Sequence, residues 1–257
     1  MKKIFIIVGL IVLVPFLPLG FYFVESVYYE AMDFKAEKAA LEYLEEKYDE
    51  HFVIDEVGYA KVLGDEGGGY TLQAHPVGNG AISFTVGANE KYQVTRDDYK
   101  ESKWENDFSK EMVQRVESLF PGSGKIYAYG SFPEEIVDRY SIDESYQFII
   151  DENPLQSFER IHIVNFEEPF EKETELKKIY ELWEMVKDRP VNNNNIEINY
   201  YPRDLFRKLN TSTSDLNQFE NQNREEMFYF CRISKDAVQE KPISSPEDIE
   251  GFCRELR

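Results

Sequence analysis

One uninterrupted apolar stretch, Ile4–Val24, constrains this chain more than any other feature of its sequence. The stretch holds twenty-one residues and no charge. An α-helix rises about 1.5 Å per residue, so a helix of this length spans roughly 30 Å, the thickness of a bilayer's hydrocarbon core. Lys2 and Lys3 precede the stretch and Glu25 follows it. Because basic residues favour the cytoplasmic side, the sequence predicts a single-pass transmembrane helix with a cytoplasmic N-terminus and an extracellular remainder.

The alternative for this stretch is a secretory signal, which also begins with basic residues and continues into an apolar core. Signal cores usually hold about 7–15 residues, and cleavage follows a pattern of small residues such as Ala-x-Ala. The stretch is longer than such a core, and Val24-Glu25-Ser26 matches the cleavage pattern poorly. The sequence therefore favours an uncleaved anchor in the cell membrane over secretion after cleavage. It also makes the lipid bilayer a partner of residues 4–24.

Acidic residues outnumber basic ones, 49 Asp and Glu against 29 Lys and Arg, which gives a formal net charge of −20. Binding to a nucleic-acid backbone depends on clustered Lys and Arg that displace counterions, so nucleic acid is not expected as a partner. Solubility at a crowded surface accounts for the acidic charge, and recruitment of cations or of a basic partner is the alternative.

The fold class that we expect is α+β, with the transmembrane helix followed by two α+β domains. Residues 1–29 form the anchor and a juxtamembrane segment. Residues 30–121 form a helix-meander-helix domain, and residues 125–257 form the second domain. The run Pro121-Gly122-Ser123-Gly124 ends a predicted helix and marks the boundary between them.

In the first domain, a helix over Glu30–Asp49 is expected to pack through a stripe formed by Phe34, Leu41, Leu44 and Tyr48. Gly-rich breaks, including Gly64–Gly69, separate the β-forming runs that follow, and this predicts an antiparallel meander. The expected elements are strands at 52–63, 69–75 and 81–86, a strand or loop at 92–94, and a helix at 97–120.

In the second domain, apolar patterning predicts an alternation of strands and helices. Runs of asparagine predict a turn over Asn192–Asn195, and polar composition predicts an exposed loop over Asn210–Arg224. Ser245 followed by Pro246 is a strong signal for a helix start. The expected strands lie at 125–129, 146–150, 161–166, 196–201 and 227–233, and helices are expected at 133–140, 171–187, 202–209 and after residue 245.

Cys231 and Cys253 are the two cysteines of the chain. Cys231 lies in a predicted strand, and Cys253 is expected on the apolar face of the last helix with Ile249, Phe252 and Leu256. Packing of that helix on the strand would bring the two sulfurs together. A disulfide across 22 positions would contribute about 3 kcal/mol in an oxidising compartment. The sequence leaves a structural disulfide and a pair of buried thiols as alternatives.

The sequence contains no catalytic or cofactor motif. Its three histidines are isolated, so no zinc-type spacing arises, and we expect His75 and His162 to be structural. Acidic pairs are abundant, but with 49 acidic residues their adjacency does not identify a catalytic pair. We therefore expect no catalytic residue, no cofactor and no metal site. Aromatic side chains are the candidate contacts for a peptide or glycan, namely Tyr70, Tyr92, Tyr200 and Tyr201.

Residues 1–121 carry short motifs that follow the basic start and the apolar stretch. These are Ala40-Leu41-x-x-Leu44-x-x-x-Tyr48, Gly58-Tyr59, Tyr70-x-x-x-Ala74-His75-Pro76 and Phe84-Thr85-Val86. This part of the chain resembles the small membrane-anchored YfjL-like proteins of Bacillus-type bacteria and, more distantly, the DUF3139 group. The resemblance implies a Gram-positive cell-surface setting and a helix-plus-meander first domain. These families have no assigned activity to carry over.

Together these predictions favour a non-enzymatic, membrane-tethered extracellular protein that contacts another envelope protein, a peptide or a wall component. The first alternative is an accessory subunit of a conjugation or secretion channel, by analogy with the anchor, helix and curved sheet of VirB8-like proteins. The second is an envelope hydrolase without a recognisable motif. A hydrolase would require His75, His162 or a carboxylate pair to meet in a concave pocket.

Overall fold

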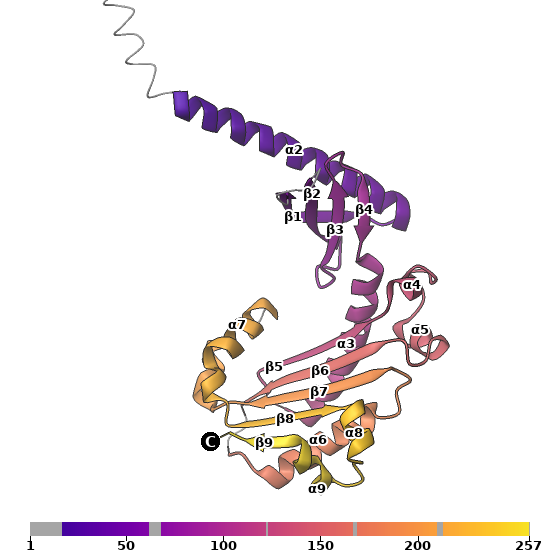
Figure 1. Cartoon of the computed structure of the whole chain (residues 1–257), viewed down its shortest axis with the longest axis vertical. Coiled ribbons are helices and arrows are strands. Elements are labelled where there is room, and N and C mark those ends of the chain that lie inside the picture. Colours follow the sequence, from indigo (N-terminus) through magenta and orange to yellow (C-terminus); the bar gives the residue numbers. More distant parts are fainter. Residues whose placement is uncertain (1–16, 62–67, 122, 167–168, 210–212, 257) are drawn as a thin grey trace, which may run out of the picture. The chain divides into compact units, whose positions relative to one another are not determined.

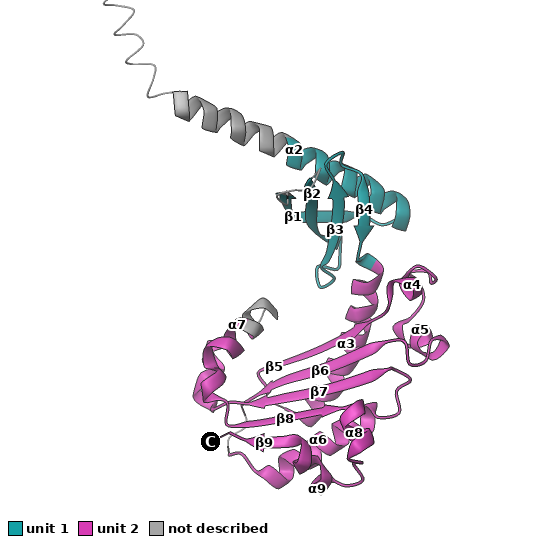
Figure 2. Ribbon diagram, in the orientation of Figure 1, with its two compact units in different colours: residues 1–99 teal, residues 100–257 magenta. Residues whose placement is uncertain are grey.

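The computed structural model describes residues 17–61, 68–121, 123–166, 169–209 and 213–256 of the chain (Figure 1). The chain divides into two compact units, residues 1–99 and residues 100–257 (Figure 2). The first unit contains a sheet of four strands in the order β1-β2-β3-β4, and the second contains a sheet of five in the order β5-β6-β7-β8-β9. Both units combine a sheet with helices, so the fold is α+β.

The predicted N-terminal transmembrane helix is wrong. Among the residues that the structure describes, no helix is both long enough and apolar enough to cross a membrane. Residues 4–16 of the apolar stretch lie outside the described residues. Its last eight residues, 17–24, open helix α2 (Leu17–Tyr48), and Glu25 follows within the same helix.

The first unit contains the predicted antiparallel meander. Its neighbouring strands all pair antiparallel, and Tyr59 opposes Tyr70 while Leu72 opposes Val86. Residues 62–67, which include most of the predicted Gly-rich turn, lie outside the described residues. The strands are β1 (Phe52–Lys61), β2 (Gly68–Pro76), β3 (Phe84–Asn89) and β4 (Val94–Asp97).

Helix α2 packs through a stripe that shares Leu44 with the predicted one. Among the side chains of this helix that the structure describes, the buried ones are Ala36, Ala40 and Leu44, whereas Phe34 is 64% exposed. These three residues recur at intervals of four and therefore lie on one face of the helix. Alanine lets the helix backbone approach the sheet closely, so the small side chains rather than Phe34 form the contact face.

A buried carboxylate links the end of α2 to the end of β4. The Asp97 side chain is 1% exposed, and Lys47 Nζ donates to it at 2.8 Å. The hydroxyls of Tyr43 and Tyr48 also donate to Asp97. Burial acts to raise the pKa of Asp97, but the Lys47 and tyrosine donors outweigh it and hold that pKa below its usual value.

The second unit places helices and a mixed sheet in one core. Strands β6 and β7 run parallel, joined through α6, and the other neighbouring strands pair antiparallel.

The strands of the second unit are β5 (Lys125–Ser131), β6 (Phe158–Asn165), β7 (Asn193–Tyr200), β8 (Tyr229–Ser234) and β9 (Cys253–Glu255). Its α-helices are α3 (Tyr99–Leu119), α4 (Glu134–Val137), α5 (Tyr146–Glu152), α6 (Lys172–Val186), α7 (Thr213–Asn223), α8 (Lys235–Glu240) and α9 (Pro246–Ile249). Three short 3₁₀ helices, Arg203–Lys208, Arg224–Glu226 and Glu250–Phe252, complete it.

The boundary between the units lies before α3, not after it at Pro121–Gly124. Helix α3 buries Trp104, Phe108, Met112 and Val116 in the core of the second unit. A break in helical structure therefore did not coincide with a break in the core, because a helix belongs to the unit against which its apolar face packs.

Two other predictions of local structure are wrong. Residues 146–150 form the start of helix α5 rather than a strand, with Tyr146, Ile149 and Ile150 buried at helical spacing. The Ser145 hydroxyl accepts a hydrogen bond from the amide of Phe148 at 3.1 Å and caps that helix. Asn193–Asn195 begin strand β7 rather than a turn, and Asn194 donates to the carbonyl of Val186 at 2.7 Å.

A buried ion pair joins the sheet to the turn after α6. The carboxylate of Glu159 on β6 is 2% exposed, and Arg189 Nε and Nη2 donate to it at 2.7–2.9 Å. The Tyr146 hydroxyl donates to the same carboxylate at 3.1 Å. Glu159, Arg189 and Tyr146 lie in or beside the core, and each supplies a hydrogen-bond partner to a polar group that would otherwise be buried without one.

Candidate functional site

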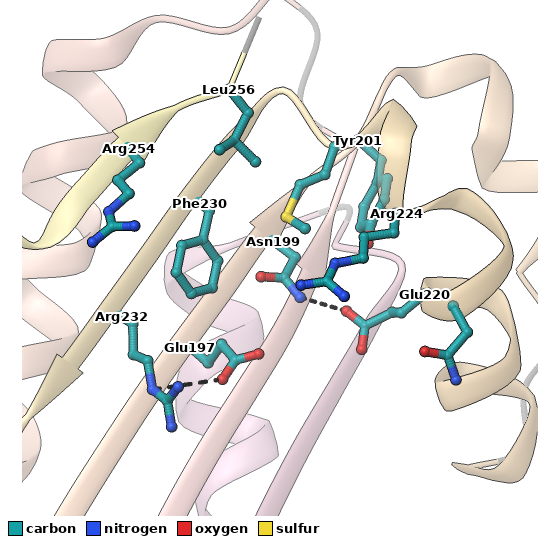
Figure 3. Close-up of a pocket in the computed structure, with 11 residues that line it drawn as sticks. Glu197, Asn199, Tyr201, Glu220, Arg224, Phe230, Arg232, Arg254 and Leu256 are labelled. Carbon is teal, nitrogen blue, oxygen red and sulfur yellow. Dashed lines mark hydrogen bonds and ion pairs between the residues drawn. The ribbon is translucent and has the colours of Figure 1, made fainter.

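A groove of about 480 Å³ lies over the face of the five-stranded sheet opposite α3 and α6 (Figure 3). Strands β7, β8 and β9 form its floor, and the end of α7 with the following turn forms one side. The residues that line it are Glu197, Asn199, Tyr201, Glu220, Asn221, Arg224, Met227, Phe230, Arg232, Arg254 and Leu256.

Strand alternation explains why polar residues reach this groove. In β7, Ile196, Ile198 and Tyr200 point into the core, and the alternate residues point the other way. Glu197 and Asn199 therefore line the groove, and Tyr201 continues the same alternation beyond the strand. The same rule separates buried residues of β8 from the alternate residues Phe230 and Arg232.

The C-terminal strand β9 brings Arg254 and Leu256 to the groove. Cys253 lies directly opposite Cys231 in the ladder between β9 and β8, and the two form a disulfide with an S–S distance of 2.00 Å. The prediction that a helix carries Cys253 is wrong, because α9 ends at Ile249 and the chain becomes extended at Cys253. The disulfide holds a strand of only three residues against the sheet, and that strand presents Arg254.

Helix α7 forms the side of the groove, although the sequence predicted a loop over Asn210–Arg224. Leu216 and Phe219 are its buried residues, and they pack on Tyr201 and on Phe166 after β6. Two apolar residues at i and i+3 are enough to dock a polar helix when a matching apolar patch exists elsewhere in the fold. Residues 210–212 lie outside the described residues.

The two acidic groups of the groove are engaged by neighbouring side chains. Glu197 lies 3.1 Å from Arg160 Nη2 and 4.0 Å from Arg232 Nε. Glu220 lies 3.1 Å from His162 Nε2, and the Asn199 Nδ2 group donates to it. Both carboxylates therefore already have partners within the protein.

The three histidines pair with different acidic residues. His51 pairs with Glu45 and His75 with Asp55, both at 2.8 Å. His162 lies beneath α7, and its Nε2 is within 3.1 Å of both Glu220 and Asn199. Within the described parts of the chain, no group of three His, Cys, Asp or Glu residues is arranged to hold a metal ion.

Two residues that line the groove each carry a buried polar atom that has no hydrogen-bond partner among the described residues. These atoms are Asn199 Oδ1 and the Tyr201 hydroxyl, in residues that are 4% and 0% exposed. Burial raises the pKa of Tyr201, and the charges of Glu220 and Glu197 raise it further, so the hydroxyl keeps its proton. The groove therefore offers one acceptor and one donor that the protein itself does not satisfy.

Arginine supplies the positive charge of the groove. Arg224, Arg232 and Arg254 are all exposed at its rim, in a chain whose formal net charge is −20. Figure 3 shows Arg224 on one side of Asn199 and Arg232 and Arg254 on the other. Guanidinium groups bind carboxylates and phosphates through paired hydrogen bonds, so the arrangement can hold an anionic ligand.

The predicted aromatic contacts are mostly buried. Tyr70, Tyr200 and Tyr201 are at most 2% exposed, so they do not form an exposed sticky face. Of these, Tyr201 lines the groove. The sequence did not identify the groove arginines, Arg224, Arg232 and Arg254, because they come from separate segments of the chain. The one signal that could have found Arg232 is its place between buried positions of a predicted strand.

No protein-family model matches this chain, and no curated protein matches it. A solved structure to which it is similar is the crystal structure of a DUF5037 family protein from Ruminococcus gnavus ATCC 29149. The two share 16% sequence identity with a TM-score of 0.49, over 79% of this chain and 89% of that chain.

Proposed function

We infer that this chain is a non-enzymatic binding module of the cell envelope and that the groove over β7, β8 and β9 holds its partner. The observation that carries the proposal is the pair of buried, unpartnered polar atoms in the groove, Asn199 Oδ1 and the Tyr201 hydroxyl. A buried polar atom without a partner costs about 1–3 kcal/mol, so a ligand that supplied the missing partners would recover that free energy.

The disulfide supports a location outside the cytoplasm. Cytoplasmic reductants keep thiols reduced, whereas disulfides persist in secreted proteins and at cell surfaces. The bond between Cys231 and Cys253 fixes the strand that carries Arg254. An oxidising compartment would therefore also be the compartment in which the groove is fully formed.

The histidine beneath α7 is the one feature that favours the hydrolase alternative. A general base must reach the proton that it removes from substrate or water. His162 does not line the groove, and its Nε2 faces Glu220 and Asn199. Among the described residues, no hydroxyl or thiol hydrogen-bonds to that ring. The contacts instead join α7 to β6 and β7, which is a structural role.

Photo-crosslinking in the native cells tests the binding proposal. The change Phe230→p-benzoylphenylalanine places the reactive group in the groove, and the same change at Phe148 on α5 is the matched control, since Phe148 is 42% exposed and lies outside the groove. We expect one discrete adduct from position 230, weakened by Tyr201→Phe, and none of that mass from position 148. Equal adducts from both positions, or none from position 230, would contradict the proposal.

A further inference from the structure

We propose that the groove binds an extended acidic peptide, whose carboxylates pair with Arg224 on one side and with Arg232 and Arg254 on the other. This inference rests on the proposed function, because it names the class of ligand for the same groove. It concerns an internal peptide segment that carries at least two acidic side chains.

The three rim arginines are largely free of partners within the protein. Arg232 approaches Glu197 only at 4.0 Å and is 61% exposed at its side chain. Arg224 and Arg254 form no ion pair with any residue that the structure describes. Three guanidinium groups at the rim of one groove are therefore open to a ligand, and no lysine lines that groove. Planar guanidinium matches carboxylate in shape, so arginine rather than lysine is the residue expected here.

Two residues in the groove, Asn199 and Tyr201, carry buried polar atoms without a partner among the described residues. Asn199 Oδ1 accepts hydrogen bonds, and the Tyr201 hydroxyl can donate one. A peptide backbone supplies both an N–H donor and a carbonyl acceptor at short spacing. Phosphate and sulfate present almost only acceptor oxygens, so they would leave Asn199 Oδ1 unsatisfied. The floor therefore favours a peptide over a simple inorganic anion.

An apolar surface lies between the charged side chains of the groove. Met227, Phe230 and Leu256 line the groove along with the polar residues. Figure 3 shows Phe230 between the Arg232–Arg254 side and Asn199. An extended peptide projects alternate side chains to opposite sides, so a residue between two acidic ones can place an aliphatic side chain on Phe230.

The overall acidity of the chain does not oppose this ligand. At physiological ionic strength, exposed charges beyond about 8 Å are largely screened. The charged residues that line the groove are the three rim arginines and two glutamates, and Glu197 is already paired with Arg160. Local charge thus favours an acidic ligand although the net charge is −20.

Isothermal titration calorimetry on the full chain tests the ligand class. The probe is the peptide acetyl-Asp-Glu-Leu-Asp-Glu-amide, and its neutral analogue is acetyl-Asn-Gln-Leu-Asn-Gln-amide. The groove variants are Arg224→Gln and Arg254→Gln. The matched control is Arg207→Gln, which removes an exposed arginine outside the groove. Circular dichroism and thermal midpoints check that each variant is folded.

We expect the acidic peptide to bind at least tenfold more tightly than its neutral analogue. Each groove variant should weaken binding at least tenfold, as loss of a charge-assisted hydrogen bond does, and Arg207→Gln should leave it unchanged. Inorganic phosphate at matched ionic strength should not displace the peptide. Absence of binding, equal affinity for the neutral analogue, or displacement by phosphate would overturn the inference. If the adduct at position 230 still forms in that case, the binding function stands and only the ligand class falls.

Discussion

Two adjacent tyrosines provide the sharpest test of the groove, because one hydroxyl has a partner and the other has none. Tyr200 and Tyr201 are both 0% exposed. The Tyr200 hydroxyl donates to Glu175 Oε2 at 2.7 Å, whereas the Tyr201 hydroxyl is buried without a partner among the described residues, in a residue that lines the groove. The change of tyrosine to phenylalanine removes one oxygen at each position and leaves the ring in place.

We expect opposite effects on the free energy of unfolding of the second unit. Tyr200→Phe removes a hydrogen bond to a buried carboxylate, which is worth about 1.5–3 kcal/mol, so it should destabilise by that amount. Tyr201→Phe removes a buried hydroxyl that the protein leaves unsatisfied. Because such a hydroxyl costs about 1–3 kcal/mol, this change should be neutral or stabilising by about 1 kcal/mol. The two variants should differ by at least about 1.5 kcal/mol.

Urea unfolding followed by tryptophan fluorescence measures this difference. Both tryptophans of the chain, Trp104 and Trp183, lie in the core of the second unit, so the signal reports that unit. A binding measurement on the same proteins adds a second readout, since Tyr201→Phe should weaken binding of the acidic peptide while it preserves stability. If Tyr201→Phe destabilised the unit as much as Tyr200→Phe does, the hydroxyl would have a stabilising partner and the reasoning about the groove would fail.

Three further predictions concern the disulfide and two buried charges. Replacement of Cys231 and Cys253 by alanine should cost about 3 kcal/mol in urea unfolding and should also weaken binding of the acidic peptide, because β9 loses its anchor. Because the pKa of Asp97 is lowered in the folded protein, its carboxylate stabilises the first unit above about pH 3.8, and this stabilisation is lost as pH falls through the lowered pKa. Hydrogen exchange in β1–β4 should show the loss. The variant Asp97→Asn should remove this pH dependence. Arg189→Met should destabilise the second unit by about 3–5 kcal/mol, since it leaves the carboxylate of Glu159 buried without its cation.

Each of these has a control within the chain. Reduction of the wild-type disulfide should reproduce the alanine variants, and it should have no effect on those variants. Asp98→Asn changes the neighbouring residue, whose carboxylate has no part in the cluster around Asp97, and should leave the acid dependence as in the wild type. Arg115→Met disrupts an exposed pair with Glu111 on α3, which should cost less than about 1 kcal/mol. A loss for Arg189→Met as small as that for Arg115→Met would contradict the buried-pair argument.

Local patterns in the sequence were sufficient for much of the first unit. Gly-rich breaks between β-forming runs predicted the antiparallel meander, and the structure confirms it. Such hairpins depend on neighbouring residues and on turn chemistry, which a sequence displays directly. The stripe on α2 did not follow from periodicity, because Phe34 and Ala36 compete for the contact face and only the space beside the sheet selects alanine.

Short elements in the second unit depended on what surrounds them. The run Tyr146–Ile150 is apolar enough for either a strand or a buried helix, and packing on the core selects the helix. Polar helix α7 exists because Tyr201 and Phe166 supply an apolar patch for Leu216 and Phe219. No window of sequence around α7 contains that patch.

By itself, the sequence determined the alternation that turns Glu197, Asn199 and Arg232 away from the core, since side chains of a strand alternate whatever the strand packs against. Only the tertiary structure decided that these residues meet Arg224 and Arg254 in one groove. Those arginines come from the turn after α7 and from β9, which reach the groove through side-chain packing and through a disulfide. Such contacts join segments far apart in the chain, and their geometry is set by the shape of the whole core.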